Sequence, residues 1–175
     1  IMQGITTEVL GQDGISMAPL PPQYISPWRK NLAGLDGDSD EIDWNYQTTE
    51  GYLKMLEHVK PGLNECYLVP HGNIRMEAMG LENRLPNEEE LEKMRQITRR
   101  EMEAGAIGLS TGLIYMPCAY SESKEIIEMC KVVAEYDGRF VIHQRSEADT
   151  ILDSMEEVIK IGRESGVKIH YSHFK

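Results

Sequence analysis

The alternation of strand-like and helix-like segments constrains this chain most, and it is clearest near the C-terminal end. Residues 139–143 form a run rich in β-branched and aromatic side chains, residues 148–165 have helical spacing, and residues 167–175 form a second strand-like run. His143 and His173 lie near the carboxyl ends of the two predicted strands. Two strands joined by a helix pair in parallel, so their carboxyl ends meet at one edge of a sheet. We therefore expect the two histidines to lie close together.

The same alternation extends over the whole chain. The predicted strands are residues 4–11, 65–70, 106–115, 139–143 and 167–175, and the predicted helices are residues 48–59, 87–104, 121–137 and 148–165. Asn87 and Glu90 are spaced for a capping box, and Ser121 is the expected cap of the next helix. Residues 15–47 contain four prolines and are predicted as loop.

These elements predict an α/β fold, namely a partial (β/α) TIM-type barrel of about five parallel strands with crossover helices. A full barrel of eight strands needs about 250 residues, so a chain of 175 residues is expected to hold only part of one. We interpret residues 1–175 as an internal part of a longer barrel from which some strands are missing. Such a part exposes strand edges and apolar helix faces, which favours self-association.

The charge balance limits the classes of partner. The chain has 29 acidic against 18 basic residues and a formal net charge of −11, which disfavours nucleic acid and anionic membranes as partners. Its apolar runs are shorter than the ~20 residues of a membrane helix. Cys66, Cys118 and Cys130 are odd in number and widely spaced, so neither a disulfide framework nor a cysteine metal pair is expected. A cytoplasmic location is the simplest interpretation.

The residues at the strand ends suggest metal chemistry. Neutral imidazole is a common zinc ligand, and His143 and His173 are about one strand–helix repeat apart. Asp13, in a turn after the first predicted strand, is a third candidate ligand, although an ordinary turn aspartate is the simpler interpretation. For either histidine alone, a hydrogen-bonded structural role remains an alternative.

Other polar residues near these positions have less specific roles. His71 follows the second predicted strand and is expected to bond to backbone atoms in a turn. Arg145 and Glu147 follow His143 at strand period, where they can pair with each other, orient the histidine or contact a substrate, with an ion pair as the simplest role. Tyr115 and Lys175 are candidates for contact with a substrate, or are solvated loop residues.

Five stretches in order resemble the D-aminoacylases, which are N-acyl-D-amino-acid deacylases of the amidohydrolase superfamily. They span nearly the whole chain: Gly4-Ile-Thr-Thr with residues 11–20, His71-Gly-Asn-Ile-Arg, the glycine-rich residues 105–117, His143-Gln-Arg-Ser-Glu and Ser172-His-Phe-Lys. The resemblance implies a zinc-dependent hydrolase with one or two zinc ions, acting on a small N-acyl-D-amino acid.

The resemblance also implies roles for individual residues. It makes His143 and His173 metal ligands, and it makes Tyr115 and Lys175 the groups that hold the substrate's carboxylate. Asp13 stands where the family typically has a cysteine ligand.

The resemblance implies that this chain lacks the first barrel strand with its His-x-His pair, the last strand with its catalytic aspartate, and a small accessory β-domain. We therefore expect little deacylase activity from these 175 residues alone. The alternatives are a cyclic amidohydrolase, similar to dihydroorotases or hydantoinases, and an inactive barrel fragment.

Overall fold

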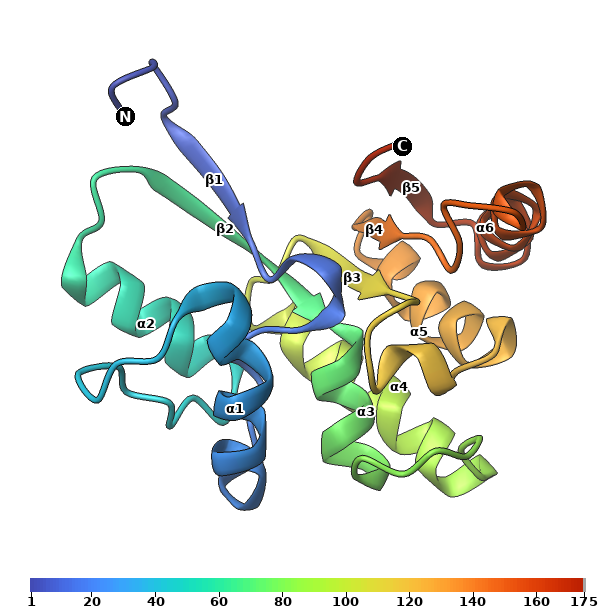
Figure 1. Ribbon diagram of the computed structural model, residues 1–175, viewed down its shortest axis with the longest axis horizontal. Helices are drawn as coiled ribbons and strands as arrows, with labels where there is room; N and C mark the ends of the chain where they lie inside the picture. Colours follow the sequence, from blue (N-terminus) through green and yellow to red (C-terminus); the bar gives the residue numbers. More distant parts are fainter. Residues whose placement is uncertain (175) are drawn as a thin grey trace.

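Five parallel strands form one sheet in a computed structural model, which describes residues 1–174 except for the side chains of residues 35 and 36 (Figure 1). The strands lie side by side in chain order, and each pairs in parallel with the next. They are β1 (Thr7–Leu10), β2 (Asn64–Pro70), β3 (Gly108–Gly112), β4 (Arg139–His143) and β5 (Lys168–Tyr171). The predicted α/β class and the five parallel strands are confirmed.

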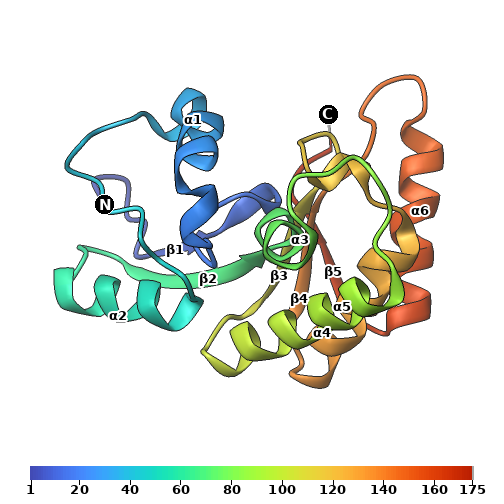
Figure 2. The same ribbon diagram turned by 90° about the horizontal axis from the view of Figure 1, so that it is seen from below.

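Helices connect consecutive strands, as crossover connections between parallel strands require. They are α1 (Ile25–Asp36), α2 (Thr49–Val59), α3 (His71–Met79), α4 (Glu88–Glu103), α5 (Ser123–Glu135) and α6 (Ile151–Ser165). Short 3₁₀ turns span Gln12–Gly14, Pro22–Tyr24 and Cys118–Tyr120. Helices α4, α5 and α6 pack side by side along one face of the sheet (Figure 2).

The α4 capping box is present as predicted. The Asn87 side chain accepts a hydrogen bond from the Glu90 backbone N–H, and the Glu90 carboxylate accepts one from the Asn87 backbone N–H, both at 2.9 Å. The predicted Ser121 cap is wrong, because Glu122 occupies the N-cap of α5 without a side-chain cap. Ser121 instead donates its hydroxyl to the Cys118 carbonyl at 2.7 Å.

The predicted loop over residues 15–47 is also wrong in part, because it contains α1. Pro27 lies in the first turn of this helix, where a missing N–H costs nothing. Trp28 and Leu32, one turn apart, are buried beside Met76 of α3 in a second hydrophobic cluster. The helical spacing of these apolar residues is a signal that the prolines obscured.

Helix α3 was not expected either. Seven of its nine residues are buried, so its sequence has no polar face to mark a helical period. His71 is the first residue of this helix rather than part of a turn.

The two faces of β4 have different surroundings. Phe140 and Ile142 are buried in the main core against the helices, whereas Val141 faces the opposite side and lines a groove with Leu68 and His170. His143 therefore points to the face that bears the groove, at the carboxyl end of its strand.

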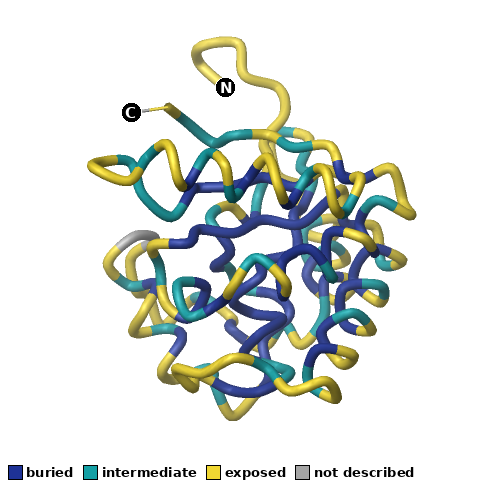
Figure 3. Tube along the Cα trace, turned by 90° about the vertical axis from the view of Figure 1, so that its right-hand side faces the viewer, coloured by how far each residue is buried: buried dark blue, intermediate teal, exposed yellow. Residues whose placement is uncertain are grey.

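The exposed and buried parts of the chain are separated in space. Buried segments run through the middle of the molecule, and the exposed N-terminal residues extend from it (Figure 3). None of the helices in the described part of the chain is both long enough and apolar enough to span a membrane.

Candidate metal centre

The carboxyl ends of β3, β4 and β5 bring the site together. In the sheet register, Gly112 is opposite His143, and Ile142 is opposite Tyr171. The two histidine rings meet edge to face, with centroids 4.5 Å apart and planes at 88°. His143 is 2% exposed, and His173 is half-buried just beyond β5. The predicted proximity of these two side chains is confirmed, while their role as metal ligands stays a prediction.

Glu147 lies between the two histidines. One carboxylate oxygen is 2.6 Å from Nδ1 of His173, and the other is 3.7 Å from Nε2 of His143. The Glu147 side chain is 16% exposed, so solvent screens these contacts only in part. Glu147 does not pair with Arg145, which was the simplest expectation, because Arg145 binds Glu157 at 2.9 Å instead.

The donor chemistry of this group fits zinc. Within residues 1–174, His143, Glu147 and His173 form the one set of three histidine, cysteine or acidic side chains whose potential ligand atoms all lie within 4.8 Å of one another. Imidazole nitrogens and carboxylate oxygens are the donors found in many zinc sites. A third expected ligand, Asp13, is not in this set.

Asp13 lies in a tightly held loop after β1. Its backbone is left-handed, with φ at 58°, and the loop is fixed by the buried Ser110 of β3. The Ser110 hydroxyl accepts a hydrogen bond from the Gly14 N–H at 3.0 Å and donates one to the Gly11 carbonyl. Cys118 also holds this loop, because its thiol donates to the Gly14 carbonyl at 3.6 Å.

Gly112 lets this loop approach Tyr115. A Cβ at Gly112 would lie 2.6 Å from the Asp13 carbonyl oxygen and 2.5 Å from the Tyr115 ring, so only glycine fits between them. The Tyr115 and His143 rings have centroids 5.2 Å apart. Burial raises the pKa of the Tyr115 hydroxyl, and the negative charges of Asp13 and Glu147 raise it further. The Tyr115 hydroxyl is thus close enough to Asp13 and Glu147 to be affected by both of their charges.

The last predicted substrate contact, Lys175, lies outside the described residues. The predicted role of Arg145 can be made more specific. Besides Glu157, its guanidinium donates to the carbonyls of Ala119 and Ser121 at 3.3 and 2.9 Å. Arg145 therefore ties the segment that follows Tyr115 to helix α6.

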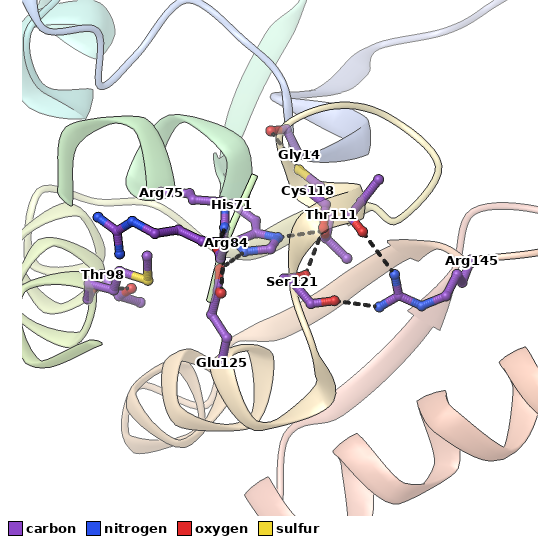
Figure 4. A network of polar contacts seen from close by, with 12 residues as sticks. Gly14, His71, Arg75, Arg84, Thr98, Thr111, Cys118, Ser121, Glu125 and Arg145 are labelled. Atoms are coloured by element: carbon purple, nitrogen blue, oxygen red, sulfur yellow. Dashed lines mark hydrogen bonds and ion pairs between the residues drawn. The ribbon is translucent and has the colours of Figure 1, made fainter. Parts of the chain in front are cut away.

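A buried polar network lies behind β3, on the side of the helices (Figure 4). His71 contacts the Thr111 hydroxyl at 2.8 Å through Nδ1 and the Glu125 carboxylate at 2.7 Å through Nε2. Arg75 also pairs with Glu125, and it donates to the Arg84 carbonyl. The expectation that His71 bonds to backbone atoms is wrong, because both of its ring nitrogens contact side chains.

The network raises the pKa of its histidine. Burial disfavours the charged form of His71, but Cys118 and Glu125 outweigh this effect and raise its pKa to about 9. The pKa of Glu125 is lowered because the charges of His71 and Arg75 outweigh the effect of burial. Thr111 adjoins Gly112 in β3, so the network supports the strand against which the Asp13 loop and Tyr115 pack.

Sequence reasoning located the histidines but not the two glutamates. Glu147 was expected mainly to pair with Arg145, and Glu125 is one of many acidic residues at helical spacing. The chain does contain one signal for Glu125, namely its place on the face of α5 that carries the buried Ile126 and Met129.

Comparison with known proteins finds relatives among the D-aminoacylases. No protein-family model matches the chain. It is 35% identical, over all of its 175 residues, to a D-aminoacylase of Alcaligenes xylosoxydans xylosoxydans, and spans 35% of that protein. The motif resemblance is therefore confirmed by a match along the whole chain.

Solved structures give the same result. A D-aminoacylase described with a binuclear metal centre matches with a TM-score of 0.85 and 32% identity, covering 99% of this chain and 35% of its own. An N-acyl-D-glutamate deacylase from Bordetella bronchiseptica, complexed with zinc and a phosphonate inhibitor, matches with a TM-score of 0.84 and 34% identity, covering 95% of this chain and 34% of its own. The chain thus spans about a third of the length of each relative.

Proposed function

From the similarity of the whole chain to the D-aminoacylases, we propose that the protein hydrolyses the amide bond of N-acyl-D-amino acids in a zinc-dependent reaction. The observation that carries the proposal is the histidine pair, His143 with His173, at the carboxyl ends of adjacent parallel strands. Active sites of (β/α) barrels lie at this edge. The substrate is a small molecule, and neither nucleic acid nor a membrane is required.

His143 and His173 are the proposed ligands of one or two zinc ions, with Asp13 as a further ligand. A bound zinc ion supplies a water of lowered pKa and polarises the amide carbonyl. In the overall reaction the water oxygen bonds to the carbonyl carbon, the C–N bond breaks, and the amine leaves with a proton. We assign the proton transfer to an aspartate elsewhere in the protein, as the family resemblance implies.

Tyr115 and Lys175 are the proposed contacts for the substrate's carboxylate. The Tyr115 ring adjoins His143, so this side chain lies beside a proposed zinc ligand. The hydroxyl stays protonated at neutral pH because burial and nearby charge raise its pKa. It can therefore donate a hydrogen bond to a carboxylate.

The test is a substrate panel applied to the intact protein after metal removal and after zinc is restored. The panel pairs N-acyl-D-amino acids with their L-enantiomers, varies the side chain between neutral and acidic, and includes cyclic ureides. We expect hydrolysis of the D-compounds only, lost on chelation and regained with zinc. Turnover of the cyclic ureides instead would favour the cyclic amidohydrolase alternative, and no turnover of either class would favour an inactive protein.

A matched pair of histidine variants sharpens the test. His143→Ala removes a proposed ligand, whereas His170→Ala removes an exposed histidine of β5 that lines the groove on the inner face of the sheet. We expect His143→Ala to abolish zinc-dependent turnover and His170→Ala to retain it. Equal activity of the two variants would contradict the assignment of His143.

A further inference from the structure

We propose that Glu147 is a positioning residue that holds His173 in the ring orientation and tautomer that bind metal. The inference rests on the proposed zinc site, and it adds a residue to that site. It begins from one contact, the 2.6 Å between a Glu147 carboxylate oxygen and Nδ1 of His173.

The length of this contact distinguishes between two roles for Glu147, namely a direct zinc ligand and a partner of the ligand His173. Two ligands of one tetrahedral zinc ion, each bound at about 2.0–2.1 Å, lie roughly 3.3 Å apart. A separation of 2.6 Å is too short for two such ligands but suits an ion-pair contact between a carboxylate and an imidazole nitrogen that carries a proton. We therefore assign the proton of His173 to Nδ1, beside the carboxylate, which leaves Nε2 as the nitrogen for the metal.

The second oxygen of Glu147 extends the same role to His143. It lies 3.7 Å from Nε2 of that ring, so the carboxylate stands between both histidines. The two rings also support each other edge to face at 4.5 Å. Carboxylates that contact a ligating histidine fix its tautomer and ring orientation.

Burial makes the carboxylate effective in this role. The His143 side chain is 3% exposed, and those of Glu147 and His173 are 16% and 31% exposed. Water competes weakly for the Glu147 oxygens in such surroundings, so the carboxylate acts on the rings with little screening. Glu147 lies in the loop between β4 and α6, a position that serves both strand ends at once.

Two measurements on the intact protein test the proposal with Glu147→Ala, Glu147→Gln and the control Asp149→Ala, which removes an exposed carboxylate two residues away. The first measures zinc affinity by competition with a chelator. The second uses ¹⁵N-labelled histidine to read the His173 tautomer by NMR in the metal-free protein. Melting temperatures of the metal-free proteins are recorded alongside.

We expect Glu147→Ala to weaken zinc binding by roughly 10–100-fold and to remove the Nδ1–H preference of His173, with its melting temperature unchanged. Glu147→Gln should fall between, because it keeps the size of the side chain and one oxygen but removes the negative charge. Asp149→Ala should stay within about twofold of the parent, as is usual for exposed positions.

Three results would overturn the proposal. The first is a zinc affinity of Glu147→Ala within about threefold of the parent, which is far from the loss typical of such residues. The second is an Nε2–H tautomer of His173 in the parent. The third is a melting temperature of Glu147→Ala that falls in parallel with its zinc affinity. The second would make Glu147 a direct ligand, and the third would make it structural. A parent that binds no zinc would instead contradict the proposed function, and the tautomer, which needs no metal, would still decide the role of Glu147.

Discussion

Replacing Glu125 by glutamine should destabilise the protein strongly, although the two side chains have nearly the same shape. Glu125 is 2% exposed, and its carboxylate contacts both His71 and the fully buried Arg75. Glutamine retains a hydrogen-bonding oxygen but removes the charge. The Arg75 guanidinium, which also donates to the Arg84 carbonyl, would then be buried without its carboxylate partner.

The magnitude follows from the cost of an uncompensated buried charge. Removing one partner of a buried ion pair typically costs about 3–5 kcal/mol, against about 5–15 kcal/mol for the whole stability of a protein. With a urea m-value of about 2–3 kcal/mol/M, the unfolding midpoint should fall by roughly 1–2 M. The assay is urea unfolding of the parent and the variant at pH 7.

The same helix provides the control. Glu135 of α5 also pairs with an arginine, Arg99, but their side chains are 56% and 39% exposed. Exposed pairs contribute about 0–1 kcal/mol, so Glu135→Gln should barely shift the midpoint. A Glu125→Gln variant no less stable than Glu135→Gln would refute the reasoning.

A double variant tests the cause. If the cost arises from the unpaired guanidinium, adding Arg75→Met to Glu125→Gln should recover part of the lost stability, because both charges are then absent. A double variant that loses the full sum of the two single effects would show that the ion pair is not the source.

Three further predictions concern the same region. The pKa of His71 is about 9 in the folded protein against 6.5 for an ordinary histidine. The stability that His71 gives to the folded state is therefore complete below pH 6.5 and is lost as the pH rises through 9. Urea unfolding at pH 6, 7.5 and 9 should show this fall in stability, and a His71→Gln variant should show a flatter profile. Gly112→Ala places a Cβ against the Asp13 carbonyl and the Tyr115 ring and should cost about 1–3 kcal/mol in urea unfolding, whereas an unchanged midpoint would contradict the close packing. Tyr115→Phe should raise KM for an N-acyl-D-amino acid by roughly 10–100-fold with kcat little changed, and Tyr120→Phe should leave both constants unaltered; a fall in kcat alone would argue against the carboxylate contact.

Local patterns in the sequence determined the order of the fold. Short β-rich runs separated by helical segments require parallel pairing, and the sheet has its strands in chain order. The Asn87 capping box involves residues three positions apart, so it was readable without any tertiary contact. The histidines at the ends of β4 and β5 followed from the same argument, because one repeat separates them.

Tertiary structure decided everything that depends on burial from all sides or on contacts between distant segments. Helix α3 is covered all round, so no polar face marked its period, and prolines hid the apolar spacing of α1. The contacts of Glu125 with His71 and of Glu147 with His173 join residues from different repeats. A carboxylate on a helix or in a loop looks the same in sequence whether it faces water or a buried ring, because only packing determines its surroundings.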